Sequence, residues 1–144
     1  MKRAAVTLLA SFLWTACSTA QPEQVVRVGI GQPFTLTVGA AAQLTGVDLK
    51  VGFTGVSSDS RCPKGEQCAW AGDAVVQVWM QRGSDPRQAL VLHTAAGAGQ
   101  AAQALGHELR LVRVSPEAVA ARPILPADYA VTLVLSVATR PAER

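Results

Sequence analysis

The chain has 144 residues, of which 49% are hydrophobic and 16% are charged. This length allows one domain of ordinary size, and the composition excludes a chain that is mainly disordered. The 13 lysines and arginines against 10 acidic residues give a formal net charge of +3. No apolar run reaches the ~18 residues that a membrane-spanning helix needs, which excludes a polytopic membrane protein.

The N-terminal segment has the pattern of a secretory signal. Lys2 and Arg3 supply positive charge ahead of an apolar stretch over 4–14, which is too short to serve as a spanning anchor. The stretch is apolar on every face, which argues against an amphipathic helix packed on the domain. We therefore predict a signal-peptide helix over 1–16, a tether over 17–24 and one folded domain over 25–140.

Two cleavage sites compete at the end of this signal. The segment 15–18, Thr-Ala-Cys-Ser, resembles a bacterial lipobox, although Trp14 stands where leucine is usual. Cleavage after Ala20 is the alternative, because small residues occupy the two positions that matter. Lipidation is preferred because it gives Cys17 a role. It predicts a lipoprotein of the cell envelope, anchored to the membrane through Cys17 on the periplasmic side, whereas the alternative predicts a soluble periplasmic or secreted protein.

The charge balance changes when the signal is removed. Loss of Lys2 and Arg3 leaves 11 basic and 10 acidic residues in the mature chain. The remaining basic residues are scattered singly and form no stripe interleaved with aromatic residues. Nucleic acid is therefore not an expected partner.

Alternation of apolar and polar residues with a period of two recurs along the mature chain, as in half-buried strands. It predicts about seven strands, at 25–30, 34–38, 47–53, 74–81, 89–93, 109–114 and 129–138. No amphipathic helix of ten or more residues separates them, so a parallel sheet built from βαβ units is not expected. The predicted fold class is all-β, an Ig-like or Greek-key β-sandwich with one short disulfide-closed loop.

The connections between strands are rich in turn residues. The segment 95–103 is a Gly/Ala/Gln loop of flexible composition, and 115–127 contains three prolines. Ser115 and Pro116 predict a short helical turn over 116–120. Tyr129 follows this proline loop and resembles the tyrosine corner of Greek-key sandwiches, whose hydroxyl bonds to nearby backbone. A half-buried aromatic on an edge is the alternative, and both roles are structural.

The segment 59–73 is polar and turn-rich and contains Cys62 and Cys68. In an oxidising compartment these cysteines are expected to form a disulfide, worth about 2 kcal/mol in the chain-entropy model. Their five-residue spacer disfavours thiol redox chemistry. A metal site would need His93 or His107, which lack ligand spacing, so we expect no metal and no cofactor.

The same segment carries a resemblance to a known family. Asp-Ser-Arg-Cys-Pro, four residues and then Cys-Ala-Trp-Ala-Gly, over 59–72, resembles the signature of a family of uncharacterised bacterial exported proteins and lipoproteins. A looser likeness covers Phe-Thr-Leu at 34–36, Val-Asp-Leu-Lys-Val at 47–51 and Pro-Ala-Asp-Tyr-Ala-Val at 126–131. The resemblance implies a small β-sandwich domain and no particular chemistry.

Five residues of this segment are candidates for contact with a partner: Asp59, Arg61, Lys64, Glu66 and Trp70. Tryptophan and arginine are frequent at binding hot spots. Each assignment has a structural alternative. Trp70 can pack on the disulfide or cap the sandwich, and Asp59 and Arg61 can form an ion pair across the loop.

Enzymatic function is not indicated by any motif. The chain has no Gly-x-Ser-x-Gly elbow and no His-Glu-x-x-His, and Phe34 stands where a dinucleotide fingerprint needs its third glycine. The carboxylates form no recognisable acid–base pair, although residues distant in sequence can converge in space. We therefore predict no catalytic residues.

The predicted function is a non-catalytic, envelope-anchored binding module that presents the Cys62–Cys68 loop to an envelope protein. This hypothesis predicts that Trp70 and Arg61 are exposed. The alternative is a secreted inhibitor or small-ligand carrier, with a protruding rigid loop or an internal cavity of several hundred Å³. An enzyme with an unrecognised site and a purely structural envelope protein are weaker alternatives.

Overall fold

The computed structural model describes residues 25–97 and 99–139. The predicted signal peptide (1–16), the lipidation candidate Cys17 and the tether (17–24) lie outside the described residues. Over the two described ranges, no helix is long and apolar enough to cross a membrane.

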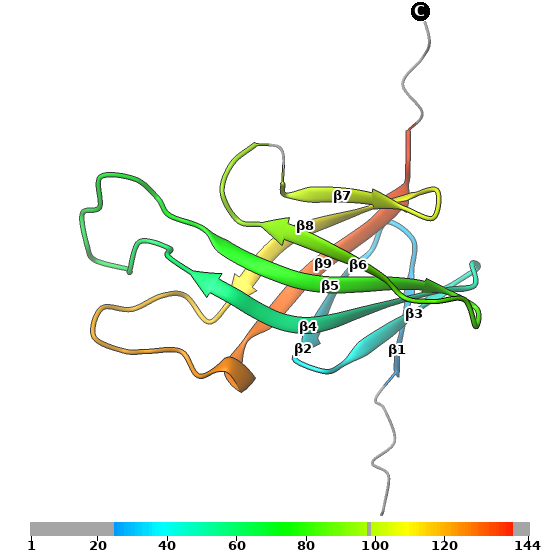
Figure 1. The fold of residues 1–144 in the computed structure, drawn as a ribbon, viewed down its shortest axis with the longest axis horizontal. Helices are drawn as coiled ribbons and strands as arrows, with labels where there is room; N and C mark the ends of the chain where they lie inside the picture. Colours follow the sequence, from blue (N-terminus) through cyan, green and yellow to red (C-terminus); the bar gives the residue numbers. More distant parts are fainter. Residues whose placement is uncertain (1–24, 98, 140–144) are drawn as a thin grey trace, which may run out of the picture.

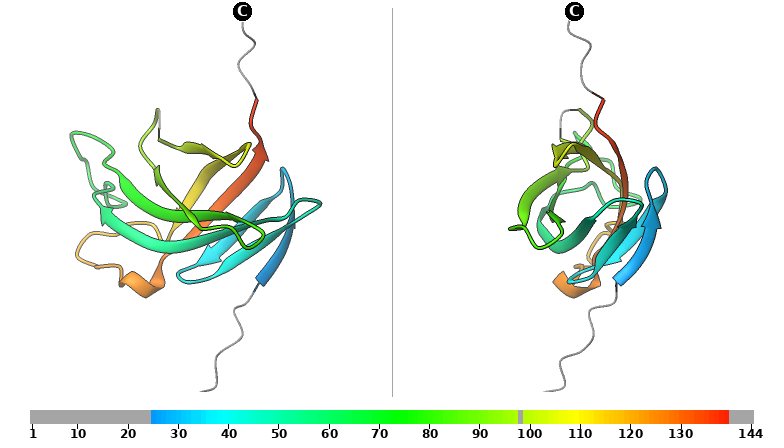
Figure 2. Two further views of the ribbon diagram at one scale, coloured as in Figure 1. Left: turned by 45° about the vertical axis from the view of Figure 1, so that its right-hand side comes forward. Right: turned by 90° about the vertical axis from the view of Figure 1, so that its right-hand side faces the viewer.

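Within the described residues, nine strands form two sheets, and Figures 1 and 2 show these sheets packed against each other. One sheet has the order β1 (Val25–Gly29), β3 (Ala41–Thr45), β4 (Leu49–Asp59), β5 (Ala74–Arg82) and β6 (Gln88–His93). The other has the order β2 (Pro33–Thr37), β9 (Ala130–Val137), β8 (His107–Ser115) and β7 (Ala101–Ala104). Neighbouring strands are antiparallel except β1 and β3, which are parallel. The predicted all-β sandwich is confirmed.

The core lies between the two sheets and follows the predicted alternation. In β5, Ala74, Val76, Val78 and Met80 are buried while the residues between them are partly exposed. β9 supplies three fully buried residues to the same core from the other sheet: Val131, Leu133 and Leu135. Because successive side chains of a strand point to opposite faces, this period of two was visible in the sequence.

The described residues form nine strands where about seven were predicted, because β3 and β7 were not recognised. β3 begins with two consecutive buried alanines, Ala41 and Ala42, and alanine gives little contrast in an alternation pattern. β7 begins within 95–103, which was predicted to be a loop of flexible composition. Ala101 and Gln103 instead pair with Arg110 and Glu108 of β8. The sequence AAQA has low strand propensity, so the neighbouring strand decides its conformation.

The helical turn predicted over 116–120 is also absent. Val119 instead forms isolated β-bridges with Lys64 and Arg122, and a 3₁₀ turn, η1 (Pro126–Asp128), stands just before β9. The carbonyl oxygen of Ala118 accepts a hydrogen bond of 2.8 Å from the backbone N–H of Lys64. The contact with the β4–β5 connection therefore determines the conformation of 116–120 and outweighs its local preference for a helical turn.

Candidate functional site

The segment from Ser60 to Asp73, here named the cysteine loop, connects β4 to β5 and projects beyond the ends of the sheets (Figure 1). Backbone hydrogen bonds join its two ends: Ser60 N–H donates to the Asp73 carbonyl (2.7 Å) and Cys62 N–H to the Ala71 carbonyl (2.8 Å). Gly72 has φ of +71°, and a Cβ there would lie 1.7 Å from the Ser60 carbonyl oxygen. The base of the loop thus needs glycine at this position.

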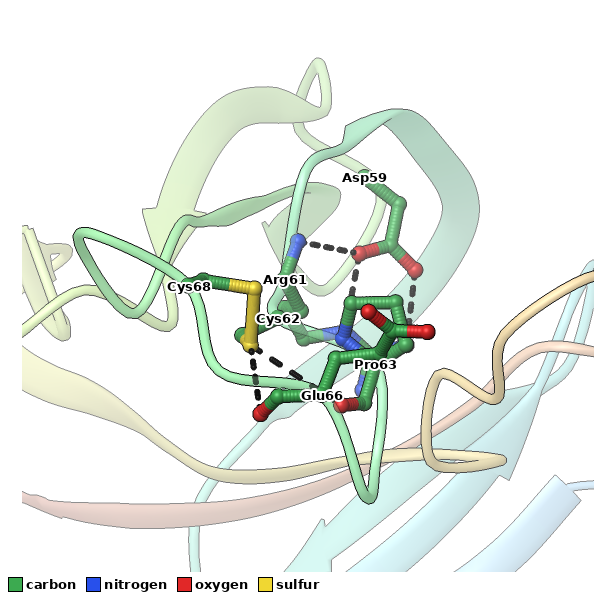
Figure 3. Close-up of a disulfide and its surroundings, with 6 residues drawn as sticks. All are labelled: Asp59, Arg61, Cys62, Pro63, Glu66 and Cys68. Carbon is green, nitrogen blue, oxygen red and sulfur yellow. Dashed lines mark hydrogen bonds and ion pairs between the residues drawn. A yellow bond between two sulfur atoms is a disulfide. The ribbon is translucent and has the colours of Figure 1, made fainter.

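The predicted disulfide is confirmed. Cys62 and Cys68 are bonded, with their Cα atoms 5.9 Å apart (Figure 3). Cys62 Sγ lies 3.6 Å from the carbonyl oxygen of Glu66. A disulfide sulfur carries no proton, so this is a packing contact and not a hydrogen bond. The bridge closes the outer part of a loop whose base is already held by backbone hydrogen bonds.

Arg61 fastens the cysteine loop to the opposite sheet. Its Nε and Nη2 atoms donate to the two carboxylate oxygens of Asp59 over 2.8 and 2.7 Å (Figure 3). Nη1 donates to the carbonyl of Val114 (3.1 Å) and Nη2 to that of Pro116 (3.0 Å). The planar guanidinium has five N–H donors in a fixed fork, and this geometry uses both sides of it.

Tyr129, which lies between η1 and β9, completes this cluster. The residue is buried and its hydroxyl donates to Asp59 Oδ2 over 2.9 Å. The predicted tyrosine corner is therefore wrong in its partner, because the hydroxyl bonds to a carboxylate and not to nearby backbone. Asp59 Oδ1 also accepts from the Arg61 backbone N–H (3.2 Å). We call Asp59, Arg61 and Tyr129 the carboxylate cluster.

The cluster shifts the acidity of its members. The Arg61 hydrogen bonds hold the pKa of Asp59 below its ordinary value, against the opposing effect of burial. Burial and the hydrogen bond to Asp59 both raise the pKa of Tyr129 above its ordinary value. Asp59 is thus an ionised acceptor and Tyr129 a neutral donor, which is the pairing that the hydrogen bond requires.

The structure divides the five predicted contact residues into two groups. The side chains of Asp59 and Arg61 are only 12% and 15% exposed, so the expected ion pair is confirmed and the expected exposure of Arg61 is wrong. Trp70 is 80% exposed, which excludes the alternative in which it packs on the disulfide. Lys64 and Glu66 are also exposed, and Lys64 lies 3.4 Å from Glu117.

A second polar cluster surrounds Asp73, and no motif in the sequence indicated it. Asp73 Oδ1 accepts hydrogen bonds from the backbone N–H groups of Thr94 (2.8 Å) and Ala95 (2.9 Å). Its Oδ2 lies 2.5 Å from His93 Nδ1. Burial raises the pKa of Asp73, but the hydrogen bonds from His93, Ala95 and Thr94 outweigh it, and the pKa lies below its ordinary value. No spacing in the sequence indicated this contact, since Asp73 and His93 meet only across the β5–β6 pairing.

Neither cluster has the composition of a metal centre. Among residues 25–97 and 99–139, no three His, Cys, Asp or Glu side chains gather in a way that could hold a metal ion. The thiols that a zinc site would use are joined in the disulfide, and His93 is directed to Asp73. The clusters act as structural links between loops.

Comparison with known proteins returns no similar chain: no family model, no curated protein and no solved structure matches this sequence. The case for function therefore comes from the geometry of the cysteine loop and its surroundings.

Proposed function

We propose that this protein is a non-catalytic binding module of the cell envelope that presents the cysteine loop to a protein partner. The observation that carries the proposal is the position of Trp70. This side chain is 80% exposed and belongs to a loop that is closed by a disulfide and tied at its base. Tryptophan offers a large contact area and is enriched at binding hot spots.

The attachment of the loop supports this function. Two cross-loop backbone hydrogen bonds, the disulfide and the Arg61 contacts hold the loop before any partner arrives. A binding element that is already ordered loses less conformational entropy on association. The exposed charges of Lys64 and Glu66 lie on the same loop and would form a polar rim around a tryptophan anchor.

The location of the module rests on the sequence. The proposal includes export and a lipid anchor on Cys17, which would hold the domain at the membrane surface. The mass of the mature N-terminus tests this part. A diacylglyceryl-modified Cys17 supports the anchored form, and a chain that starts at Gln21 overturns it in favour of a soluble exported protein.

Cross-linking in the protein's own cell envelope tests the role of the loop. Tagged wild-type protein, Trp70→Ala and the control Val137→Ala are expressed at equal levels and recovered after cross-linking. Val137 is 65% exposed and lies at the far end of β9. We expect the control to recover the wild-type partners and Trp70→Ala to lose at least one of them. Equal recovery by all three proteins would overturn the proposal.

An inhibitor is the second candidate, because a rigid loop that protrudes from a sandwich could also enter an enzyme cleft. If the cross-linked partner is an enzyme, adding excess wild-type domain should reduce its activity, and Trp70→Ala should not. The ligand-carrier alternative called for an internal cavity. The hollow of about 440 Å³ beside the carboxylate cluster opens on the surface, which favours docking over enclosure.

A further inference from the structure

The hollow beside the carboxylate cluster is a groove along one edge of β4. Four consecutive β4 residues, Val56 to Asp59, line it. The register of β4 against β5 shifts between Val56 and Ser58, and no residue of β5 lines the hollow, so the groove lies on the side of β4 away from β5. The opposite wall comes from the segment that follows β8, which runs beside the end of β4 in Figures 1 and 2.

This edge of β4 has backbone without a strand partner. β3 pairs with β4 only as far as Gly52, and the last hydrogen bonds on that side join Phe53 to Gly39 and Ala40. From Thr54 to Asp59, β4 pairs with β5 alone in the part of the chain that the structure describes. Such an edge is a template for an added extended strand.

The groove is closed at the end nearest the cysteine loop. The backbone N–H of Lys64 donates to the Ala118 carbonyl over 2.8 Å, and Lys64 forms a parallel bridge with Val119. This link lies across the path of any strand that continues along β4 beyond Asp59. An added chain that pairs with β4 up to this point therefore has its terminus there, and about six residues at ~3.3 Å each match the free segment 54–59.

The charged residues at this closed end indicate whether an amino terminus or a carboxyl terminus binds there. Asp59 already accepts hydrogen bonds from Arg61 and Tyr129, so it has little capacity left for an amino group. Arg122 also lines the groove and is bonded to Val119 through its backbone. Its guanidinium makes no ion pair or hydrogen bond with any described residue, and guanidinium matches a carboxylate.

We propose that this groove binds the free C-terminus of a partner protein as an extended strand. The terminal carboxylate meets Arg122, and the peptide backbone bonds to the free edge of β4 over 54–59. Because β4 also ends at the closed end, the peptide runs parallel to it. The apolar wall of Val119, Pro123 and Ile124 takes its side chains. This surface is separate from the tip of the cysteine loop.

A displayed library of random heptapeptides with free C-termini, selected on the purified domain, tests the proposal. The enriched sequence is then synthesised as an acid and as an amide and titrated by fluorescence polarisation. We expect selection of apolar C-terminal residues, and an affinity about tenfold lower for the amide. Recovery of no binding peptide, or equal affinity of acid and amide, would overturn the proposal.

Variants locate the site independently of the cysteine loop. Arg122→Gln should lower the affinity for the acid to that for the amide. Arg27→Gln, an exposed arginine on β1, should leave both affinities unchanged, and so should Trp70→Ala. Binding of the acid should slow amide hydrogen exchange within 54–59. Unchanged exchange in this range, or loss of acid binding in Trp70→Ala, would place the peptide elsewhere.

Discussion

The Tyr129 hydroxyl donates a 2.9 Å hydrogen bond to Asp59 Oδ2 and thereby joins two residues 70 positions apart in the sequence. Asp59 ends β4 and Tyr129 stands just before β9, so this bond links the two sheets. Arg61 approaches the same carboxylate from the cysteine loop and reaches the backbone after β8. One carboxylate therefore sets the position of the loop relative to the sandwich.

The titration of Tyr129 is directly measurable, because it is the single tyrosine of the chain. Absorbance at 295 nm should give a midpoint above the ordinary value of about 10, since burial and Asp59 both raise the pKa of Tyr129. Its contribution to stability is present below pH 10 and is lost as the pH rises through the folded-state pKa. In Asp59→Asn the midpoint should fall. A midpoint equal to that of the urea-unfolded chain would contradict the hydrogen bond.

The carboxylate of Asp59 should make stability fall in acid. Its pKa lies below the ordinary value because of the Arg61 hydrogen bonds, so its contribution is present above about pH 4 and is lost as the pH falls through the folded-state pKa. Urea unfolding should show wild type more stable than Asp59→Asn by about 2 kcal/mol at pH 6. The difference should shrink by pH 2. Asp73 is present in both proteins, so its own effect on the pH dependence cancels in the comparison. A stability difference between wild type and Asp59→Asn that does not depend on pH would contradict the role of the Asp59 carboxylate.

Arg61 should not be replaceable by lysine. Arg61→Lys loses the paired contact with Asp59 and at least one of the contacts with the Val114 and Pro116 carbonyls, because an ammonium lacks the planar fork. We expect a loss of about 2 kcal/mol in the free energy of unfolding. Arg110→Lys is the matched control, since Arg110 pairs with Glu108 at the surface and should change stability by less than about 0.5 kcal/mol. Equal losses in the two variants would remove the special role of Arg61.

Removal of the disulfide should loosen the cysteine loop without unfolding the sandwich. The double variant Cys62→Ser and Cys68→Ser should lose about 2 kcal/mol and keep the wild-type far-ultraviolet circular dichroism. Amide exchange should accelerate within 63–70 and stay slow in β5. The backbone bonds of Ser60 and Cys62 to the other side of the loop do not involve sulfur, so its base should persist. Global unfolding of the variant would show that the bridge holds the domain itself.

The sequence by itself determined the fold class and the closed loop, because both depend on short-range patterns. Alternation in β5 and β9 reports which face is buried, and two cysteines six positions apart lie close in any conformation of a turn. β3 and β7 could not be predicted in this way, because their alanine-rich sequences show no clear alternation of apolar and polar residues. Tertiary contact alone made them strands.

Only the tertiary structure decided what the contact residues do. Asp59 and Arg61 were predicted both as a partner surface and as an ion pair. The Tyr129 hydroxyl and the Val114 carbonyl of β8 hydrogen-bond to them and turn them inward. Trp70 finds no such neighbours and stays in solvent. The groove at the β4 edge likewise forms from segments about 60 residues apart. Burial depends on which distant segments meet, and no local pattern of residue types encodes that meeting.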